Sequence, residues 1–247
     1  MLLTFVTVNK NSGFLFKKTE KSIYQFLRKN QNNAWLIIDS NSNDQSGNCI
    51  QNILNQKSNL PIFILREKDN GIYHAMNKAI KICKSKYVLF VNSGDTINEL
   101  DLLNTLKDTK NIKNQSIICG YIISSKGKIL NNFIKKTIIK IEILFKLRLP
   151  SSHNSILYLT QNLKRFYFKE KYKYAADYNQ YLEMLNDNQK FLNKINFKIT
   201  NISNEGFISK RRKDSYKDCI IINLDKHRII GTIYWKIKLL ILKIISN

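Results

Sequence analysis

The chain has 247 residues and a formal net charge of +23. Hydrophobic residues make up 43% of it and charged residues 24%, a balance that excludes intrinsic disorder and a polytopic membrane protein. This length can bury a substantial core in one large α/β domain without help from disulfides. The four cysteines lie far apart, which is typical of free thiols in a reducing cytoplasm; they are Cys49, Cys83, Cys119 and Cys219.

The positive charge calls for an anionic partner, such as nucleic acid, a membrane surface or a phosphorylated substrate. Basic residues concentrate modestly at Lys135–Arg148 and Lys210–Lys213, the latter expected on a loop. Neither segment has zinc-ligand spacing or an aromatic RNA-binding signature. We therefore expect an anionic membrane surface, and no nucleic acid, as partner. The apolar start Met1–Val8 is too short for a secretory signal and predicts a strand.

The first part of the chain alternates between strand and helix patterns. Such a β-α repeat with right-handed crossovers predicts an open, mostly parallel α/β sheet flanked by helices. The expected strands are Leu2–Val8, Ala34–Asp39, Pro61–Arg66 and Tyr87–Asn92. The expected helices are Phe16–Arg28, Ile50–Gln56 and Tyr73–Cys83.

Regularity fades after Asp95, but no linker is long enough to separate independent domains. We therefore expect one domain over residues 1–228, with halves at 1–98 and 99–228. Phe133–Leu149 has no clean periodicity, and its structure stays open. Further predicted elements are helices Glu99–Leu106 and Tyr178–Leu185, a hairpin of Ile117–Ser124 and Ile129–Ile134 around Lys126-Gly127, and strand His153–Tyr158.

The C-terminal extension, residues 229–247, contains an apolar stretch that is broken by lysines. It falls short of the roughly 20 apolar residues that span a bilayer. On a helical wheel Thr232, Lys236 and Lys243 share one face and Lys238 lies nearly opposite. We expect a helix lying on the anionic cytoplasmic leaflet. The alternative is a helix packed on the domain or against a second subunit of a homo-oligomer.

Acidic residues follow successive predicted strands. Asp39 ends the second strand and opens the run D-S-N-S-N-D to Asp44. The loop Glu67-Lys68-Asp69-Asn70-Gly71 follows the third strand, and Asn92-Ser93-Gly94-Asp95 follows the fourth. Open α/β sheets bind ligands at the carboxyl ends of their strands. The acidic residues are therefore candidates for a shared binding site, although Asp39 and Asp44 could also be simple turn formers.

Three ordered motifs resemble a known family. They are G-I-Y-H-A-M-N-K at 71–78 followed by N-S-G-D at 92–95, P-S-S-H-N-S at 150–155, and A-A-D-Y-N at 175–179. Together they resemble family-2 glycosyltransferases of the bacterial polysaccharide-assembly, colanic-acid-type branch. The resemblance implies a GT-A type fold with a Rossmann-like nucleotide-binding half.

The resemblance also implies roles for residues. Asp95 would bind Mg²⁺ or Mn²⁺ with the donor diphosphate, although Asn92 replaces the first carboxylate of the family's D-x-D motif. Asp177 would be the catalytic base and His153 an acceptor-binding residue. Asp95 and Asp177 could instead cap the helices that follow them. Residues implied to bind the nucleotide sugar are Thr7, Asn9, Asp39, Asp44, Asp69, Gly71, Asn77, Asn92, Ser93 and Gly94.

The expected reaction is transfer of a sugar from a nucleoside diphosphate sugar, most simply a UDP-sugar, to a hydroxyl of a saccharide acceptor. One base and one metal suit a single displacement with inversion. The branch and the basic C-terminus suggest a lipid-linked acceptor, in assembly of capsule, exopolysaccharide or lipopolysaccharide at the inner face of the cytoplasmic membrane.

Two rival functions remain at this point. A sugar nucleotidyltransferase would share the sheet but needs a Gly- and Lys/Arg-rich phosphate loop after the first strand, which Asn9-Lys10-Asn11-Ser12-Gly13 matches poorly. A non-catalytic membrane-binding module could have kept the fold, and it would bind no nucleoside diphosphate.

Overall fold

The computed structural model describes residues 1–56, 59–108, 115–119, 144–149, 151–187, 191–194, 198–203 and 211–245. Their central feature is a seven-stranded sheet of order β3-β2-β1-β4-β7-β6-β8. The strands are β1 (Leu3–Asn9), β2 (Ala34–Asp39), β3 (Ile62–Arg66), β4 (Tyr87–Phe90), β6 (Ser116–Cys119), β7 (Ile156–Leu159) and β8 (Phe191–Lys194). The first four run parallel, β7 is antiparallel to β4 and β6, and β6 is parallel to β8. The predicted mostly parallel α/β sheet is confirmed.

The parallel strands are apolar runs because helices cover both faces of the sheet. Every residue of β1, β2 and β4 is buried. The strand register places Asn9 opposite Asp39, and Asp39 opposite Arg66. Polar residues therefore end three neighbouring strands at the same edge of the sheet.

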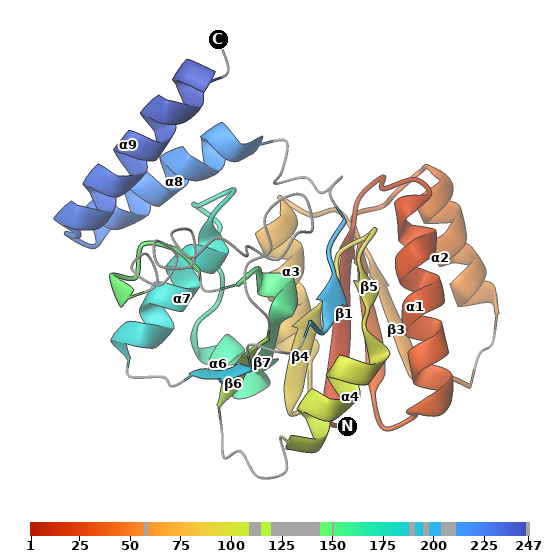
Figure 1. Cartoon of the computed structure of the whole chain (residues 1–247). Helices are drawn as coiled ribbons and strands as arrows, with labels where there is room; N and C mark the ends of the chain where they lie inside the picture. The colour runs from red at the N-terminus through yellow and green to blue at the C-terminus, as the bar shows by residue number, and fades with distance from the viewer. Residues whose placement is uncertain are drawn as a thin grey trace.

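Helices α1 (Leu15–Lys29), α2 (Gln45–Asn55) and α4 (Glu99–Asp108) contribute to the core on one face of the sheet. Helices α3 (Ile72–Ile82), α6 (Thr160–Arg165) and α7 (Ala176–Asn186) contribute to the other (Figure 1). The first core centres on Phe5, Phe26 and Trp35, and the second includes Met76 and Phe90. These two cores fix the helices that carry the residues of the site.

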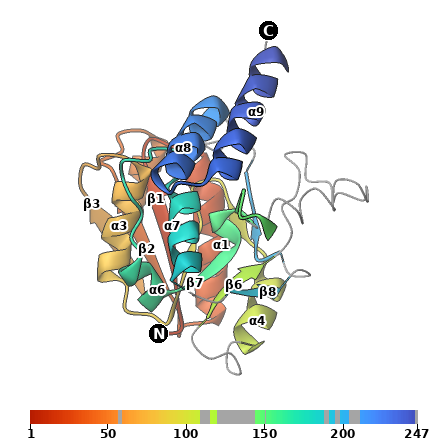
Figure 2. The same cartoon turned by 90° about the vertical axis from the view of Figure 1, so that its left-hand side faces the viewer.

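Two C-terminal helices, α8 (Arg212–Asp225) and α9 (Ile229–Ile245), form a hairpin at one end of the molecule. Gly231 allows their close approach, since a Cβ there would overlap the Asn223 side chain. Trp235 anchors α9, with ring centroids 6.1 Å from Tyr178 and 5.0 Å from Tyr216. Beyond this anchor α9 projects away from the sheet (Figures 1 and 2). No helix in the described ranges is long and apolar enough to cross a membrane.

Several predicted boundaries are corrected. Helix α2 begins at Gln45 instead of Ile50, because Asp44 caps it. A 3₁₀ turn, η1 (His153–Ser155), precedes β7, so the strand predicted from His153 begins at Ile156. Arg212 and Lys213 open α8 and do not lie on a loop.

Other elements escaped prediction or cannot be compared. The sequence did not predict α6, β8, α8, or the antiparallel pair β5 (Thr96–Ile97) and β9 (Thr200–Asn201). Strand β6 matches the start of the predicted hairpin. The remainder of that hairpin, including residues 129–134, lies outside the described residues.

Candidate active site

The site lies at the carboxyl edge of the parallel strands. Asn9 ends β1 and Asp39 ends β2, while Asp69 follows β3 and Asp95 follows β4. The polar contacts at this edge form two sets, one around Asp39 and one that runs from Asp95 to Asp177. Ser93 lies in the same loop as Asp95, and its Oγ donates to Asn9 Oδ1 of the first set at 2.9 Å. The sheet edge therefore brings together the loops on which the sequence placed most of its candidates.

The first set is the Asp39 cluster, comprising Asn9, Asp39, Ser42, Ser46 and Arg66. Asn9 Nδ2 lies 2.9 Å from Asp39 Oδ1 and 3.0 Å from both serine Oγ atoms. Asp39 Oδ1 also accepts from Ser42 Oγ at 2.6 Å, and Oδ2 accepts from Ser42 N at 3.1 Å. Asp39 is fully buried, and its side chain organises the turn after β2.

Arg66 balances the charge of Asp39 and was missed in the sequence analysis. Its Nε donates to Asp39 Oδ2 at 2.9 Å, and its Nη2 donates to Ser42 O at 2.8 Å. The register that sets the last residue of β3 opposite the last residue of β2 explains this pairing. The sequence did contain a signal for this pair: one predicted strand ends in Asp39, and the next predicted strand ends in Arg66.

Arg66→Ala is expected to lower the free energy of unfolding by about 2–4 kcal/mol, because it leaves a buried carboxylate without its cation. The other donors to Asp39 keep the loss below the full cost of an unpaired buried charge. Arg165→Ala is the matched control, since the Arg165–Asp187 pair is largely exposed and is worth about 0–1 kcal/mol. Urea unfolding of both variants measures the difference, and equal losses would contradict a structural role for the Arg66 pair.

Asp44 serves as the N-cap of α2. Its Oδ1 accepts from Ser46 N at 3.0 Å and Gly47 N at 3.3 Å, and its Oδ2 accepts from Gly13 N at 2.6 Å. The turn-forming alternative therefore describes the contacts of both Asp39 and Asp44. Their carboxylates shape the loops beside the site.

Asp69 has a carboxylate oxygen that is unpaired among the described residues. Its Oδ1 contacts His74 Nδ1 at 3.1 Å and Lys78 Nζ at 2.9 Å, whereas its buried Oδ2 has no hydrogen-bond partner in the described part of the chain. Gly71 then begins α3 with φ of +139°, and the space around its Cα is open. Asp69 Oδ2 is thus an unpaired acceptor shielded from solvent, whereas the exposed backbone at Gly71 can receive polar groups of a ligand.

The loop after β4 presents Asp95. Thr19 of α1 holds this loop, donating to Asp95 O at 2.7 Å and accepting from Gly94 N at 2.9 Å. Asp95 Oδ1 accepts from Ser203 N at 2.7 Å, and Oδ2 accepts from Asn154 Nδ2. Burial raises the pKa of Asp95 to about 6, against the lowering effect of these bonds.

The predicted alternative for Asp95, a cap on α4, is not what the structure shows. Asn98 accepts from Asp101 N at 3.4 Å through Oδ1, and its carbonyl accepts from Leu102 N. The carboxylate of Asp95 instead faces η1 and Ser203. Asp95 is therefore a buried carboxylate at the sheet edge, 3% exposed, and it does not cap a helix.

The second set of contacts is the Asp95–Asp177 network, which includes Asn92, His153 and Asn154. Asn92 Nδ2 lies 3.3 Å from Asn154 Oδ1 and 3.2 Å from His153 Nε2. His153 Nδ1 lies 3.5 Å from Asp177 Oδ2. Two carboxylates from different halves of the chain are thereby joined by one continuous set of polar contacts.

Asp177 lies in the first turn of α7, whose N-cap position is Ala175. Its Oδ1 accepts from Tyr73 OH at 3.1 Å, and its side chain is 15% exposed. Burial and the nearby charge of Asp177 raise the pKa of Tyr73 well above its ordinary value, so the phenol remains a donor. Asp177 is not the N-cap of α7, although its Oδ1 also accepts from Tyr178 N in the first turn at 2.9 Å. Part of the side chain reaches the surface.

Two predicted binding residues lie elsewhere. Thr7 is fully buried, where its hydroxyl donates to Val91 O at 2.8 Å and accepts from Trp35 Nε1 at 2.9 Å. Asn77 exchanges hydrogen bonds with the backbone of Phe168 at 2.8 and 3.0 Å. Both side chains are used in packing, so we leave them out of the site proposed below.

Sequence analysis also missed three side chains that support Asp177. Asn154 and Tyr73 were part of the quoted motifs but were given no role. Asp218 of α8 accepts from Tyr174 N at 2.7 Å and so fixes the segment that enters α7. The sequence does not indicate this contact, because the contact depends on how the hairpin of α8 and α9 packs against the rest of the chain.

A divalent cation fits this site only as a partner shared with a ligand. The described residues contain no group of three or more His, Cys, Asp or Glu side chains that could hold a metal. Asp95 provides one carboxylate, and the buried Asn92 Oδ1 lacks a hydrogen-bond partner. Mg²⁺ and Mn²⁺ favour oxygen ligands, and Mg²⁺ is commonly held by one or two carboxylates together with substrate phosphates. Asp95 is accordingly the candidate metal ligand of the protein.

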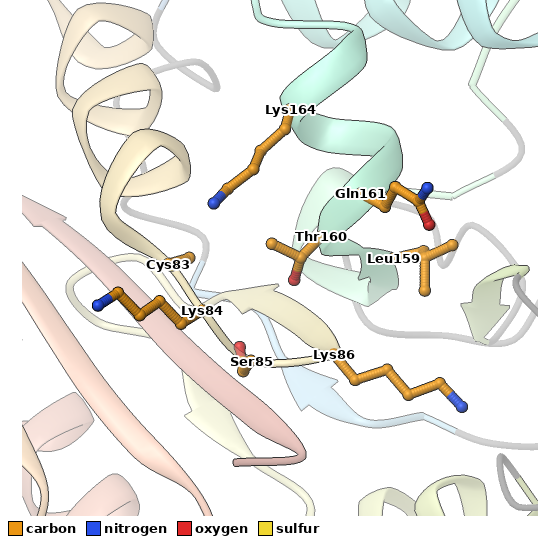
Figure 3. A pocket seen from close by; sticks show the side chains of 8 residues that line it. All are labelled: Cys83, Lys84, Ser85, Lys86, Leu159, Thr160, Gln161 and Lys164. Atoms are coloured by element: carbon orange, nitrogen blue, oxygen red, sulfur yellow. The ribbon is translucent and has the colours of Figure 1, made fainter.

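A cavity of about 360 Å³ lies at the opposite edge of the sheet, where Cys83–Lys86 lead into β4. Leu159, which ends the neighbouring strand β7, and the following Thr160 and Gln161 also line it. Figure 3 shows that Lys84, Lys86 and Lys164 point in different directions around it. Their charges do not converge on one point. This cavity is therefore no rival to the site at the carboxyl edge.

The open, mostly parallel sheet flanked by helices is a GT-A type fold. Residues 4–175 match the model of Glycosyl transferase family 2. This match covers well over half of the chain, and the chain belongs to that family.

The chain is 23% identical over 246 residues to an uncharacterized glycosyltransferase of Methanocaldococcus jannaschii, covering 95% of this chain and 83% of that protein. It is 27% identical over 158 residues to the poly(ribitol-phosphate) beta-N-acetylglucosaminyltransferase TarP of Staphylococcus aureus, covering 63% of this chain and 46% of TarP.

Two solved structures share the fold. S. aureus TarS 1-349 in complex with UDP-GlcNAc has a TM-score of 0.67 at 18% identity, over 91% of this chain and 66% of that one. The mannosyltransferase PcManGT of Pyrobaculum calidifontis, in complex with GDP-Man and Mn²⁺, has a TM-score of 0.70 at 13% identity, over 92% and 64%. The chain thus spans less than two thirds of the length of these two proteins.

Proposed function

We propose that the protein transfers a sugar from a nucleoside diphosphate sugar to a hydroxyl of a saccharide acceptor, with inversion at the anomeric carbon. The observation that carries this proposal is the Asp95–Asp177 network. It sets a carboxylate at the end of β4, suited to the donor diphosphate, beside a partly exposed carboxylate suited to the acceptor. Membership of family 2 supports the same reaction.

In this reaction the acceptor oxygen bonds to the anomeric carbon while the bond from that carbon to the diphosphate oxygen breaks. The nucleoside diphosphate leaves with the bonding electron pair, and the acceptor proton passes to Asp177. Asp177 can take this proton because Tyr73 holds one of its oxygens and part of the side chain remains exposed. A base placed within about 3 Å of the hydroxyl is worth roughly 10²–10⁴-fold in rate.

The donor side of the proposed site comprises Asn9, Asp69, Gly71, Ser93 and Asp95, shaped by Asp39 and Asp44. Asp69 contributes a buried carboxylate whose Oδ2 has no hydrogen-bond partner among the described residues. A divalent cation, when bound, would neutralise charge on the leaving diphosphate. Asp95 is the residue that would hold it, as the Mn²⁺ in the PcManGT complex suggests for the fold.

We favour UDP-N-acetylglucosamine as the first donor to test, because TarS was solved with it. Nucleotide binding is measured by thermal unfolding with UDP or GDP plus Mn²⁺. A ligand present at about 100 times its dissociation constant increases the free energy of unfolding by about 2.7 kcal/mol. For a chain of this length, that increase raises Tm by about 5–10 °C. No shift with any nucleoside diphosphate would favour the non-catalytic alternative.

The α9 apolar stripe supports an additional proposal, docking on an anionic membrane where a lipid-linked acceptor would be presented. The stripe consists of residues that are between 49% and 68% exposed; they are Ile230, Ile233, Ile237, Leu240, Ile241 and Ile244. Lys236 and Lys243 are exposed on the same helix, and the whole chain carries a net charge of +23. Apolar and cationic groups side by side suit an anionic lipid surface. Capsule, exopolysaccharide or lipopolysaccharide assembly by the colanic-acid-type branch would use such a surface.

The double variant Ile237→Asp with Ile241→Asp is expected to weaken binding to vesicles of anionic phospholipid by at least about tenfold, because each isoleucine loses its apolar burial. Leu54→Asp with Leu100→Asp is the matched control, since these exposed leucines lie on α2 and α4. Co-sedimentation at low and high salt measures the binding. Equal binding by both double variants would contradict membrane docking, as would a change only in oligomeric state.

A further inference from the structure

We propose that Asp95 sets the tautomer of His153 through the side-chain amides of Asn154 and Asn92, and that His153 thereby acts as a positioning residue for Asp177. This inference rests on the proposed function, in which Asp177 is the base. It assigns His153 a place between the two carboxylates, and not the direct contact with the acceptor that the resemblance implied.

The first step is the orientation of Asn154. An ionised carboxylate can only accept hydrogen bonds, whereas an amide has one donor end and one acceptor end. Ser203 N occupies Asp95 Oδ1, and Asn154 meets Asp95 Oδ2. Asn154 must therefore turn its NH₂ group to Asp95, which directs its Oδ1 toward Asn92.

The second step passes this polarity to His153. Because Asn154 Oδ1 accepts, the group of Asn92 that faces it at 3.3 Å must be the NH₂. The same NH₂ lies 3.2 Å from His153 Nε2. A donor facing Nε2 requires a lone pair there, so neutral His153 must carry its proton on Nδ1.

The third step reaches Asp177. With the proton on Nδ1, His153 presents a donor to Asp177 Oδ2 at 3.5 Å, while Tyr73 donates to Oδ1 at 3.1 Å. Such contacts are often long before substrate binds and shorten in the reacting complex. Tyr178 N also donates to Oδ1 at 2.9 Å, so donors lie on both oxygens of Asp177. They favour the ionised carboxylate and restrict its rotation. The carboxylate of Asp177 would then be held, ionised and in a fixed orientation, where it can accept the proton of the acceptor hydroxyl.

Burial and packing restrict the orientation of the His153 ring. His153 is 8% exposed, and its ring packs edge to face on Phe90 with centroids 6.3 Å apart. The network also accounts for an amide at position 92, where the resembled motif has a carboxylate. A carboxylate there would accept, which would place the proton on Nε2 and remove the donor to Asp177 unless the ring became cationic.

The direct test is NMR of protein labelled with ¹⁵N in its histidine rings, at about pH 8, above the ordinary titration of histidine. The chain has three histidines, and His153→Asn identifies the signal of His153. Couplings between ring nitrogens and carbon-bound protons distinguish the tautomers. We expect Nδ1 protonated and Nε2 bare. A proton on Nε2 in the wild-type protein would overturn the proposal, and this readout needs no substrate.

Asn92→Asp should place a proton on His153 Nε2, as a changed tautomer or as an imidazolium. The matched control is Asn52→Asp, which adds the same charge on the exposed face of α2. The histidine signals of Asn52→Asp should be the same as those of the wild-type protein. An unchanged Nε2 in Asn92→Asp would show that the relay of amides does not set the tautomer.

Kinetics test the positioning role. His153→Asn keeps an N–H donor near the place of Nδ1 and loses the Nε2 end, whereas His153→Leu removes both. We expect His153→Asn to retain at least about tenfold more turnover than His153→Leu, at similar affinity for UDP and similar Tm. Equal loss in both variants would overturn the positioning role, since it would place the function of His153 at Nε2. Failure of the wild type to transfer any sugar would instead count against the proposed function, and the tautomer would still be measurable.

Discussion

Asp177→Asn is expected to lower sugar transfer by about 10²–10⁴-fold, the usual contribution of a positioned proton acceptor. The amide has nearly the same shape but cannot take the acceptor proton. Tyr73 can still donate to the amide oxygen, so the fold around α7 should be kept. Affinity for nucleotide should be close to that of the wild type, because the donor residues lie on the loops after β1, β3 and β4.

Asp187→Asn is the control for the Asp177 variant, since Asp187 lies at the far end of α7 and pairs with Arg165. Its turnover should stay within a few-fold of the wild type. Initial rates at saturating donor, together with titration of UDP and Mn²⁺, separate chemistry from binding. Turnover of Asp177→Asn near the wild-type level would mean that another group takes the proton, with His153 the next candidate.

Asp95→Asn is expected to reduce transfer by at least about 10³-fold, because the protein loses the one carboxylate placed to share a cation with the leaving diphosphate. The variant should lose its response to Mn²⁺ as well as its turnover. Asp101→Asn, at the start of α4, changes a nearby carboxylate outside the site. Retained turnover with unchanged metal dependence in Asp95→Asn would contradict the metal role.

The pH dependence of donor binding provides a second readout for Asp95. Its carboxyl has a pKa raised to about 6 by burial, and a cation needs the ionised form. Protons should therefore compete with Mn²⁺ for Asp95. The affinity for the donor in the presence of Mn²⁺ should then fall as the pH drops below about 6. UDP-N-acetylglucosamine suits the titration because its phosphates lack the second ionisation that a phosphate monoester has near pH 6. A flat profile in the wild type, or the same slope in Asp95→Asn, would contradict this account.

The parallel half of the fold could be predicted because its signals are local. Each strand of that half is a short apolar run, and polar residues at its end or in the loop after it can be placed at one sheet edge. Asp39, Asp69 and Asp95 were found this way. The sequence could not show how these groups are used. Asp39 is paired with Arg66, whereas a buried oxygen of Asp69 has no hydrogen-bond partner among the described residues.

The second half was harder because its elements depend on contacts distant in sequence. Strands β5 and β9 have two residues each and exist only as a pair. Thr7 shows the same difficulty for a single side chain. The resemblance implied a ligand contact, but the Thr7 hydroxyl is used by Val91 O and Trp35 Nε1. Both partners lie far from Thr7 in the sequence.

The Asp95–Asp177 network lies between these cases. Its residues came from three separate motifs, so their types could be recognised one by one, but the order of contacts from Asp95 to Asn154, Asn92, His153 and Asp177 appears only in three dimensions. Asn154 was passed over because an amide inside a motif has no obvious chemistry until its two neighbours are known.

The most direct test of the central claim is release of nucleoside diphosphate from a panel of UDP- and GDP-sugars with Mn²⁺, comparing the wild type with Asp177→Asn and Asp95→Asn. The account predicts release by the wild type from at least one donor, increased by a saccharide acceptor, and strongly reduced in both variants. Absence of release from every donor, or equal release by wild type and variants, would contradict it.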